Sequence, residues 1–416
     1  MTPEIKQQIE QIRRGEVPEG FKHNSASVMP CDWNTCDFHE VATIQSGLVS
    51  PKEEPYCFMF HIGPDNIERD TGRIGNLKTA CELGLVSGKF YFDAGSIVYS
   101  KIRPNLNKVC IPNFEGICSA DCYSIKARAG IDRDYLFNLM LSFPFYRRAV
   151  ACSMRTGMPK INQDDLNAIP VVMPSQLEEQ QKIAAILTTQ DKVIELKEKL
   201  LAEKQRQKKY LMQQLLTGKK RLPGFSGEWK EERLGKLFLE RKETNCEGLQ
   251  MLAITGTQGI IPRKELDLKD NSSEDKSKYL RVCVGDIGYN TMRMWQGVSA
   301  YSNYEGIVSP AYTILKPCPS INAKYFAYLF KMPEIIFLFY RSSQGLVDDT
   351  RNLKYENFKK IKVFYPPDIE EQAAIAEVLS VADREIDLLQ QNIKQEKQKK
   401  KALMQLLLTG IVRVCG

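Results

Sequence analysis

The stretch KKYLMQQLLTGKKRL, from Lys208 to Leu222, returns almost unchanged as KKALMQLLLTGIVRV, from Lys400 to Val414. A shift of 192 positions also places Glu178–Gly218 on Glu370–Gly410 without a gap, so that EEQQKIAAIL lies on EEQAAIAEVL. A composition rich in Lys and Gln can produce chance matches in the middle of such an alignment. It does not easily match both ends in one register, so the chain contains an internal repeat.

The repeat extends towards the N-terminus. With a shift of 190 positions, GSIVYSKIR (Gly95–Arg103) aligns with GDIGYNTMR (Gly285–Arg293), and FEGICSA aligns with YEGIVSP. IEQIRRGEVPEGF (Ile9–Phe21) resembles QQLLTGKKRLPGF (Gln213–Phe225). The order along the chain is therefore circular: helix end, globular segment, long helix, globular segment, long helix. We predict an N-terminal helical segment that closes the repeat (1–30), a first domain (31–174), a central helix (175–222), a second domain (223–367) and a C-terminal helix (368–416).

Residues 177–217 predict one long helix, because they are rich in Glu, Gln, Lys, Leu and Ala and contain neither Gly nor Pro. Gly218 ends it and Pro223 follows. In both copies the apolar residues recur at alternating steps of four and three, which is the heptad pattern of a coiled coil. The predicted seam consists of Ile183, Leu187, Ile194, Leu201, Leu211, Leu215, Ile375, Leu379, Ile386, Leu389, Ile393, Leu403 and Leu407. Because neither helix would be stable alone with half of its seam exposed, we expect the two to bury each other.

The globular segments have a different pattern. GKFYFDAGSIVYSKIRPNLNKVCIP combines β-branched and aromatic residues with Gly, Pro and Asn, which is typical of short strands. DRDYLFNLMLSFPFYRRAV and NAKYFAYLFKMPEIIFLFYR predict helices with an apolar face. Each globular segment is thus expected to be a mixed α+β domain, with Tyr99 and Tyr289 in its core.

Composition sets broad limits on the class of protein. The chain has 416 residues, of which 43% are hydrophobic and 26% charged, and a net charge of +7. It has no apolar run long enough to span a membrane and no signal peptide, so we expect a soluble, cytoplasmic protein. The interval Lys204–Arg221 holds seven Lys and Arg and no acidic residue. Such a run is either a solvated helix face or a contact for a polyanion or an acidic partner, and both interpretations stay open.

Motifs for catalysis and metal binding are missing. The twelve cysteines include no CxxC pair and only three histidines are present, which favours reduced thiols over a zinc site. GLVSGKF (Gly84–Phe90) has the wrong spacing for a P-loop, and FYPPD (Phe364–Asp368) lacks the Asn of an adenine methyltransferase motif. We therefore predict a non-catalytic chain, and an enzyme with an unrecognised site is the alternative.

These features together resemble a known family. The P…LEEQ-x-I-A-x-I-L start of the helix, its LMQQLLTGKKRLPGF end and their duplication around globular segments are similar to the specificity subunits of type I restriction-modification systems, over essentially the whole chain. The resemblance implies two homologous target-recognition domains, each binding one half of a bipartite DNA sequence, related by a pseudo-two-fold axis. It also implies that the two long helices form an antiparallel coiled coil, which sets the spacer between the half-sites.

The resemblance also implies partners and cofactors. Two methyltransferase subunits would dock on the chain to make an adenine-N6 methylase, and two restriction subunits, which are ATP-driven translocases with a nuclease, would complete the complex. AdoMet, ATP and magnesium would belong to these partner subunits, and none to this chain. Two alternatives remain: the specificity subunit of a fused methylase-nuclease system, and a coiled-coil scaffold that does not bind DNA.

Two pairs of matched loops supply the side chains that DNA binding requires. Phosphates are bound by Arg, Lys and small polar residues, and base edges by Arg, Asn and Gln. One pair is YSKIRPNLNK with YNTMRMWQG, and the other is SMRTGMPK with RSSQGLVDDTR. The predicted DNA-binding residues are Lys101, Arg103, Asn105, Asn107, Lys108, Arg155, Thr156, Lys160, Asn290, Arg293, Trp295, Gln296, Arg341, Ser343, Gln344 and Arg351. Alternatively, Arg103 and Arg293 pair with acidic residues to hold the fold, and Trp295 serves packing rather than base contact.

Overall fold

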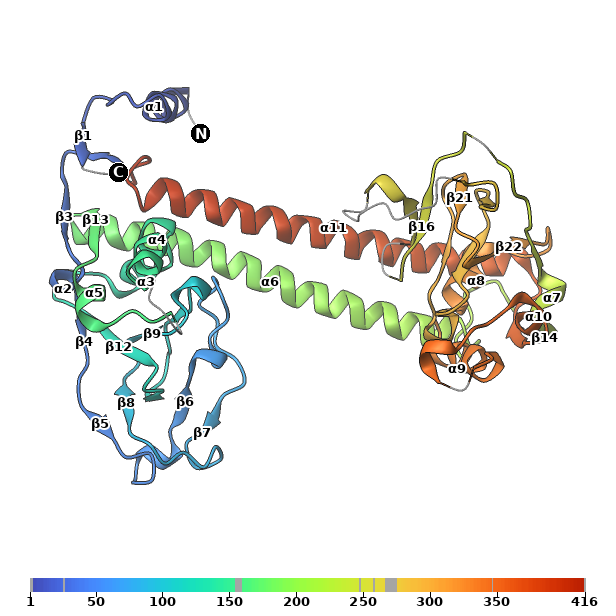
Figure 1. The fold of residues 1–416 in the computed structure, drawn as a ribbon, viewed down its shortest axis with the longest axis horizontal. Helices are drawn as coiled ribbons and strands as arrows, with labels where there is room; N and C mark the ends of the chain where they lie inside the picture. Colours follow the sequence, from blue (N-terminus) through green and yellow to red (C-terminus); the bar gives the residue numbers. More distant parts are fainter. Residues whose placement is uncertain are drawn as a thin grey trace. The chain divides into compact units, whose positions relative to one another are not determined.

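The computed structural model describes residues 3–24, 27–153, 159–246, 248–256, 259–265, 275–345 and 347–414 (Figure 1). The chain divides into two compact units. Unit 1 comprises residues 1–197 and 392–416, and unit 2 comprises residues 198–391. In the described part of the chain, none of the helices combines the length and apolar character that crossing a bilayer requires.

Unit 1 is a mixed α+β domain followed by the first half of a long helix. Its elements in chain order are α1 (Pro3–Arg13), β1 (Phe21–Asn24), β2 (Ser27–Pro30), β3 (Trp33–Asp37), α2 (Phe38–Val41), β4 (Ala42–Ile44), β5 (Leu48–Val49), η1 (Tyr56–Phe58), β6 (Phe60–Ile62), η2 (Pro64–Asn66), β7 (Lys78–Thr79), β8 (Lys89–Phe92), β9 (Ile97–Ser100), η3 (Pro104–Leu106), β10 (Val109–Cys110), β11 (Gly116–Cys118), β12 (Cys122–Ala127), α3 (Arg133–Leu141), α4 (Phe143–Cys152), α5 (Gln163–Asn167), β13 (Pro170–Pro174) and α6 (Leu177–Leu215), which continues into unit 2.

Unit 2 repeats much of this order. Its elements are β14 (Lys230–Arg233), α7 (Leu234–Leu237), β15 (Phe238–Glu240), β16 (Leu252–Ile254), β17 (Ile260–Pro262), η4 (Arg263–Glu265), β18 (Leu280–Val282), β19 (Ile287–Asn290), η5 (Met294–Gln296), β20 (Ser299–Tyr301), β21 (Gly306–Val308), β22 (Tyr312–Pro317), α8 (Ala323–Leu329), α9 (Pro333–Ser342), η6 (Asp348–Thr350), α10 (Tyr355–Phe358), β23 (Lys362–Tyr365) and α11 (Ile369–Leu407), which continues into unit 1.

Two sheets of unit 1 have counterparts of the same topology in unit 2. Unit 1 has a four-stranded sheet in the order β10-β9-β12-β4, and unit 2 has one in the corresponding order β20-β19-β22-β15. The pair β13–β3 in unit 1 likewise corresponds to β23–β14 in unit 2. Tyr99 and Tyr289 lie at equivalent places in β9 and β19 and are almost fully buried. The structure therefore confirms the predicted α+β class, the repeat and the core position of both tyrosines.

The N-terminal segment is helical over a shorter range than predicted. Helix α1 ends at Arg13, and the β1–β2 hairpin occupies the rest of the predicted segment 1–30. The helix stops because Gly15 and Gly20 adopt positive φ on either side of Pro18, and these conformations do not continue a helix. No residue of α1 is buried, so its proposed role in closing the repeat stays a prediction.

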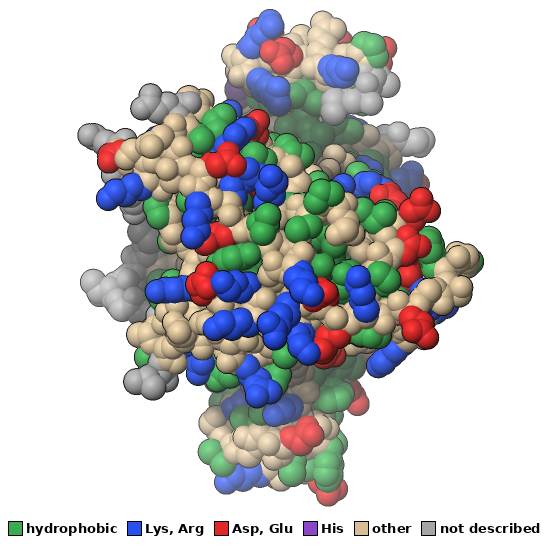
Figure 2. All heavy atoms as spheres, turned by 90° about the vertical axis from the view of Figure 1, so that its right-hand side faces the viewer, with side chains coloured by type: hydrophobic (Ala, Val, Ile, Leu, Met, Phe, Trp, Pro, Cys, Tyr) green, Lys and Arg blue, Asp and Glu red, His purple; other side chains and the backbone are tan. Residues whose placement is uncertain are grey.

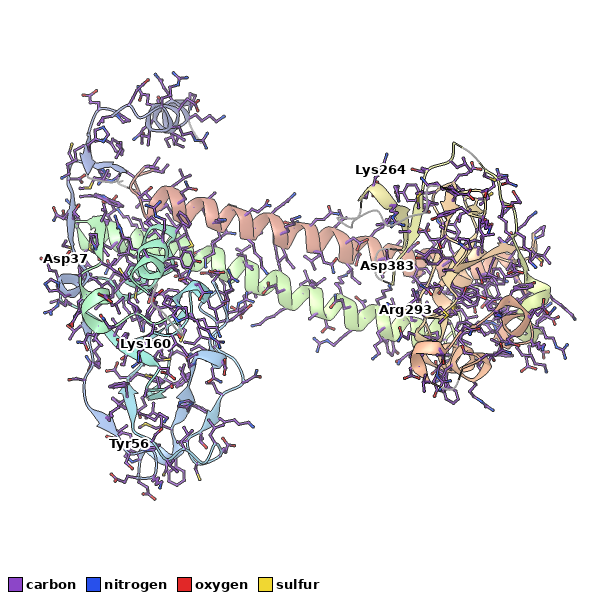
Figure 3. All side chains as sticks on the ribbon, in the orientation of Figure 1. Asp37, Tyr56, Lys160, Lys264, Arg293 and Asp383 are labelled. Carbon is purple, nitrogen blue, oxygen red and sulfur yellow. The ribbon has the colours of Figure 1, made fainter. Side chains whose placement is uncertain are left out.

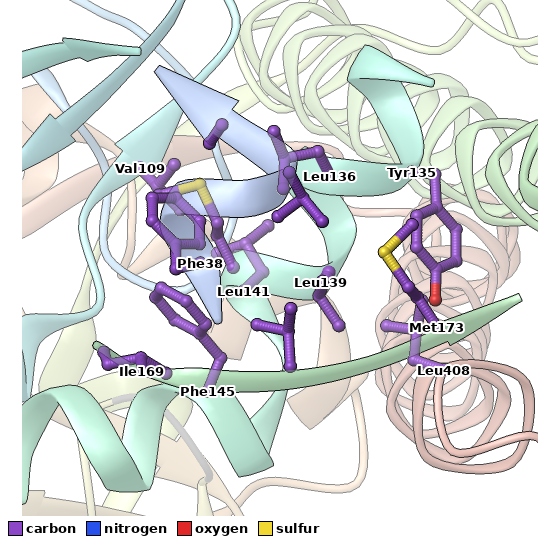
Figure 4. Packing of buried hydrophobic residues seen from close by; sticks show 14 of the residues in the cluster. Phe38, Val109, Tyr135, Leu136, Leu139, Leu141, Phe145, Ile169, Met173 and Leu408 are labelled. Carbon is purple, nitrogen blue, oxygen red and sulfur yellow. The ribbon is translucent and has the colours of Figure 1, made fainter. Parts of the chain in front are cut away.

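The two cores explain why the long helices are part of both units. The core of unit 1 includes Ile183 and Leu187 from the beginning of α6, together with Leu407 and Leu408 from the end of α11. Figure 4 shows Leu408 beside Met173 and Tyr135 in this core. The core of unit 2 is built in the same way from the end of α6 and the beginning of α11. Each domain thus packs on the start of one helix and the end of the other.

Contacts between the helices run in opposite directions along the sequence. In unit 1, Gln190 and Lys197 of α6 both donate to Glu396 of α11, and Lys400 pairs with Asp191 at 2.6 Å. In unit 2, Lys208 pairs with Asp383, which is the equivalent pair by the shift of 192. Asp383 is labelled on α11 in Figure 3. Helices α6 and α11 are therefore antiparallel.

The predicted seam lies in this helix pair. All thirteen predicted seam residues are buried or half-buried, with Leu187 and Leu379 completely inaccessible. Ion pairs also occupy four of the seven basic residues between Lys204 and Arg221: those of Lys204, Arg206, Lys208 and Arg221. This part of the basic run therefore serves the protein's own carboxylates.

The repeated TG motif ends each long helix in the same conformation. Gly218 and Gly410 both have a φ of 71°, which is strained for any other residue. The amide of Lys220 donates to the carbonyl of Gln214 at 3.0 Å, and the equivalent Val412 donates to Leu406 at 3.1 Å. The glycine amides also donate three residues back, Gly218 to Leu215 at 3.4 Å and Gly410 to Leu407 at 3.3 Å, which is the inner bond of a Schellman cap. The outer bond comes from one residue later than in the standard motif. These hydrogen bonds turn the chain so that Arg221 and Arg413 lie over the start of the other helix.

Two ion pairs then join helix ends to helix beginnings. Arg221 donates to both carboxylate oxygens of Glu371, at 2.5 and 2.7 Å. Arg413 makes the equivalent bidentate contact with Glu179, at 2.6 and 2.9 Å. Only 2% of the Glu371 side chain and 6% of the Glu179 side chain are exposed. The motif occurs twice because the end of each helix secures the beginning of its partner.

The repeated EGI motif contains a glycine that the packing requires. A Cβ at Gly116 would lie 2.7 Å from the carbonyl oxygen of Phe60 and 2.6 Å from the ring of Phe92. We expect Gly116→Ala to lower the free energy of unfolding of unit 1 by about 2 kcal/mol, as overpacking does. Gly75→Ala is the matched control, because a Cβ there meets nothing within 4 Å. Hydrogen–deuterium exchange of the unit 1 core checks the prediction, and equal protection in the two variants would contradict it.

Candidate nucleic-acid interface

The first pair of matched loops follows equivalent strands of the two sheets. In unit 1 the loop connects β9 to β10 and contains η3, and in unit 2 it connects β19 to β20 and contains η5. Arg103 and Asn107, on either side of η3, have φ of 48° and 45°, and Gly297 after η5 has a φ of 80°. These left-handed residues bend each loop sharply away from its sheet.

Each loop is held by one side chain, which is buried in unit 1 and half-buried in unit 2. In unit 1 the amide of Asn107 donates to Leu141 O at 3.2 Å and to the Asp70 carboxylate at 3.1 Å. In unit 2 the Lys331 ammonium donates to the carbonyls of Gly297 and Ser299, at 2.7 and 2.6 Å. A shift of 190 places Gly297 on Asn107 and Lys331 on Leu141. The same two positions are therefore used to hold each loop. In unit 1 the hydrogen-bond donor, Asn107, belongs to the loop itself, whereas in unit 2 the donor, Lys331, lies between α8 and α9.

In unit 1 the described end of the second predicted loop contacts the first loop. Arg103 N donates to Pro159 O at 2.8 Å, and Ile161 N donates to Lys101 O at 2.9 Å. Arg103, Asn105 and Lys160 are exposed, and Figure 3 marks Lys160 on this side of the unit. The predicted residues Arg155 and Thr156 lie outside the described residues. The exposed side chains form a surface with two cations and an amide.

Three other predicted residues of unit 1 have internal contacts. Asn107 is 7% exposed and holds the loop as described. Lys108 donates to Pro64 O at 2.6 Å, and the Lys101 ammonium lies 5.2 Å from the centre of the Tyr123 ring. Burial is the main cause that lowers the pKa of Lys101, and the positive charge of Lys160 adds to it. The structure therefore gives Asn107 and Lys108 a role in shaping the loop.

In unit 2 the two predicted loops are also adjacent. Leu353 N donates to Thr291 O at 2.9 Å, and the Tyr289 hydroxyl donates to Leu353 O at 3.1 Å. Gln344 and Asn352 exchange backbone hydrogen bonds that close the second loop. Arg293 and Gln296 are exposed on the first loop, and Figure 3 labels Arg293. Both units therefore present an exposed arginine at matched positions, Arg103 and Arg293, and an exposed amide shortly after it, Asn105 and Gln296.

The remaining predicted residues of unit 2 have partners within it. The Asn290 side chain accepts from Met292 N at 3.0 Å, and the Ser343 hydroxyl donates to Phe339 O at 2.8 Å. Arg351 pairs with Asp348 at 2.9 Å. Gln344 is exposed, and the exposed Arg341 lies 6.0 Å from the centre of the Phe337 ring. Arg103 and Arg293 form no ion pair with a described residue, so the alternative that they hold the fold has no contact to support it.

Sequence reasoning missed the residues that support these loops. Lys331 was absent from the prediction, although it is a lysine where the first copy has Leu141 in an apolar helical segment. The signal in the sequence was a charged residue at a position where the other copy of the repeat has an apolar one. Phe337 and Tyr340 were missed as well, because helical periodicity places them on the solvent side of α9 without saying what they contact.

Burial gives Lys331 an unusual protonation equilibrium. Desolvation, helped by the charge of Lys208, lowers the pKa of Lys331 to about 8, from an ordinary value of 10.5. The unfolded chain then binds more protons than the folded one between pH 8 and 10.5, so stability rises with pH in this window. We expect unit 2 to gain up to about 2 kcal/mol relative to a Lys331→Met variant between these limits. Urea denaturation of both proteins at pH 7.5 and 10.5 measures the difference. Identical pH profiles would rule it out.

The described residues contain no group of three or more His, Cys, Asp or Glu side chains that could hold a metal ion. The eleven described cysteines are free thiols. Burial raises the pKa of Cys118 to about 12, which keeps this thiol protonated and unreactive.

The chain is similar to known specificity subunits. The type I restriction enzyme EcoDI specificity subunit of Escherichia coli is 41% identical over 181 residues, which are 44% of this chain and only 38% of that protein. The putative type I restriction enzyme MjaX specificity subunit of Methanocaldococcus jannaschii is 25% identical over 446 residues, covering 95% of this chain and 97% of that protein.

Two solved structures share the fold. The crystal structure of the HsdS subunit from Thermoanaerobacter tengcongensis has a TM-score of 0.50 and 19% identity, covering 94% of this chain and all of that one. The type I restriction-modification system S subunit from M. genitalium has a TM-score of 0.58 and 14% identity, covering 93% and 97%.

The family model for the type I restriction modification DNA specificity domain matches two segments, residues 30–205 and 267–397. The first segment contains the domain of unit 1 and much of α6, and the second contains the 291–298 loop, α8, α9 and much of α11. The match thus covers both copies of the repeat and well over half of the chain. The chain therefore belongs to the family of the type I restriction modification DNA specificity domain.

Proposed function

We propose that this chain is the DNA sequence-specificity subunit of a type I restriction-modification complex. Unit 1 binds one half of a bipartite duplex site and unit 2 binds the other half. Helices α6 and α11 set the number of base pairs between the half-sites. The chain contributes recognition and no catalysis, and the methylation and cleavage reactions take place on its partners.

The duplication of the loops is the observation that carries this proposal. Arg103 and Asn105 in unit 1, and Arg293 and Gln296 in unit 2, are exposed on loops that leave equivalent strands. Arg and amide side chains are the groups that bind base edges in pairs of hydrogen bonds. A protein with two such surfaces matches a DNA site with two separated halves.

Electrostatics also favours DNA as the partner of unit 2. Figure 2 shows Lys and Arg side chains gathered on the side of unit 2 that carries α7, α10 and β14. Arg233, Lys354 and Lys360 are exposed there. The stretch Lys354–Lys362 has four lysines and one glutamate, whereas the equivalent stretch of unit 1, Asn162–Pro170, has two aspartates and no lysine or arginine. Phosphate binding outside the recognition loop therefore belongs mainly to unit 2.

The partners follow from the same assignment. Two methyltransferase subunits dock on the long helices and form an adenine-N6 methylase with this chain, and two restriction subunits complete the complex. AdoMet, ATP and magnesium are bound by these partners. Exposed apolar residues at matched positions, Leu196 on α6 and Leu388 on α11, are 53% and 64% exposed and offer two equivalent docking points.

Methylation mapping tests the proposal. DNA from cells that carry the gene together with its methyltransferase partners is sequenced for N6-methyladenine. The expected result is a motif of two short half-sites separated by a fixed number of unspecified bases. A continuous motif, or methylation that persists when this chain is deleted, would overturn the proposal.

Three measurements separate the alternatives. A scaffold that does not bind DNA predicts no salt dependence, whereas the proposed subunit, within its complex, should lose affinity steeply as salt rises. Methylation or cleavage by the purified chain alone, with all cofactors present, would favour a standalone enzyme. A fused methylase-nuclease system is recognised by a single partner polypeptide that copurifies with the chain and has both activities.

A further inference from the structure

Unit 2 carries an aromatic surface made of Trp295, Phe337 and Tyr340. The Phe337 and Tyr340 rings are nearly parallel, with centres 6.4 Å apart and an angle of 15°. The centre of the Trp295 ring lies 6.2 Å from that of Tyr340. Phe337 is 56% exposed and Tyr340 is 37% exposed, and Trp295 is half-buried.

This surface does not belong to the core of unit 2. Helix α9 directs Ile335 and Phe339 into the core, where both are buried. Phe337 and Tyr340 are three positions apart and therefore share another face of the helix. Keeping large aromatic rings in water has no benefit for folding, and exposed apolar groups of this kind mark binding sites.

The polar atoms of the surface are already used. The indole N–H of Trp295 donates to Met292 O at 2.9 Å. The Tyr340 hydroxyl accepts from Arg351 at 2.9 Å, and the same guanidinium lies 4.1 Å from the centre of the Tyr340 ring. Because these groups have partners, the surface offers a ligand the ring edges and the ring faces that Arg351 leaves uncovered. It suits an apolar group better than a hydrogen-bonding one.

The surroundings are cationic and join the surface to the recognition loop. Trp295 lies in η5, next to the exposed Arg293 and Gln296. Arg341 lies beside Phe337, and Arg351 beside Tyr340. The Arg351 charge is partly balanced by Asp348. An apolar patch bordered by arginines fits a polyanion that also carries apolar groups.

Thymine supplies such a group in duplex DNA. In the major groove its 5-methyl group is the distinct apolar feature of a base edge, and aromatic or aliphatic side chains contact it. We propose that the aromatic surface of unit 2 recognises thymine methyl groups in the half-site that this unit binds. This inference rests on the proposed function and adds to it the chemical group that one unit selects.

Unit 1 carries its aromatic pair at other positions of the equivalent helix. Phe143, which is 68% exposed, and Tyr146 of α4 have ring centres 6.4 Å apart. A shift of 190 places Asn105 at the position of Trp295, Arg147 at that of Phe337 and Val150 at that of Tyr340. Arg147 is exposed. At the positions of Trp295 and Phe337, unit 1 therefore presents an amide and a guanidinium, so the two units do not offer the same side chains to DNA.

Replacement of thymine by uracil tests the inference, because uracil lacks only the methyl group. The full chain, assembled with its methyltransferase partners, is titrated with duplexes of the mapped site in which each thymine is replaced in turn. In one half-site we expect the affinity of the wild-type complex to fall about fourfold for each contacted methyl group. The double variant Phe337→Ala/Tyr340→Ala should bind the thymine and uracil duplexes equally. Tyr340→Phe keeps the ring and should keep the discrimination.

Controls separate the possible failures. Leu239→Ala removes an exposed apolar residue outside the aromatic surface, 55% exposed, and should leave the uracil response unchanged. If the wild-type complex does not prefer the mapped site at all, the proposed function fails. If it prefers the site but no uracil effect disappears in the double variant, the thymine assignment is wrong. If the double variant fails to assemble with its partners yet still discriminates uracil, the surface binds protein and the inference is overturned.

Discussion

Inserting seven residues into α6 and seven into α11 is expected to lengthen the spacer between the half-sites and to leave both half-sites unchanged. A heptad adds about 10 Å of helix, and a base pair spans about 3.4 Å, so the spacer should grow by up to about three base pairs. Methylation at the original spacing should fall more than about 100-fold, since the expected cost exceeds about 3 kcal/mol.

The structure indicates where the insertions belong. Lys197 of α6 donates to the Asn392 side chain of α11 at 2.9 Å, so insertions after Lys197 and before Asn392 lengthen the helices at facing positions. A heptad preserves the alternating steps of the seam and the ion pairs on both sides. Methylation mapping measures the new spacer.

A heptad in α6 alone is the control for this experiment. It shifts one helix against the other, so that Lys204 and Lys208 no longer face Glu385 and Asp383. We expect this variant to lose assembly altogether. New bases in either half-site of the doubly lengthened chain would contradict the assignment of recognition to the two units.

The second large effect is expected from the buried ion pair in unit 2. Arg221→Met removes the cation from Glu371, whose side chain is 2% exposed. A buried carboxylate that loses its partner typically costs 3–5 kcal/mol, and because Arg221 is 26% exposed we expect about 3 kcal/mol here. Hydrogen–deuterium exchange of the unit 2 core in increasing urea measures this loss.

Two further variants make the measurement specific. Lys362→Met removes a cation from an ion pair with Glu231 in which both side chains are more than half exposed, and it should cost less than about 1 kcal/mol. Arg221→Met combined with Glu371→Gln should recover part of the loss, because the buried charge is gone. If Arg221→Met costs no more than Lys362→Met, the helix ends are not held by this pair.

The repeat accounts for how far prediction from the sequence succeeded. The shift of 192 and the steps of four and three identified α6, α11 and their seam, because a helix imposes its period on neighbouring residues. The α+β class of each unit followed from short alternating segments. The N-terminal segment was predicted less well, since a single helical pattern before Gly15 gave no sign of the β1–β2 hairpin.

The candidate interface was predicted at the level of loops and less well at the level of residues. Arg103 and Arg293 are exposed at matched positions, as a binding role requires. Asn107 and Asn290 have the same chemistry but form hydrogen bonds within their own units. Sequence cannot separate these cases, because an amide binds a base edge or a backbone carbonyl with the same atoms.

The sequence by itself determined the duplicated plan: two related domains, two long helices and the seam that joins them. These features depend on periodicity and internal similarity, which are properties of the chain alone. Only the tertiary structure decided that Arg221 meets Glu371, that Lys331 holds one loop where Asn107 holds the other, and that three aromatic residues gather on unit 2. Such contacts join side chains that are distant in sequence. The sequence offers each of these side chains several chemically equivalent partners, and only the fold places one of them within contact distance.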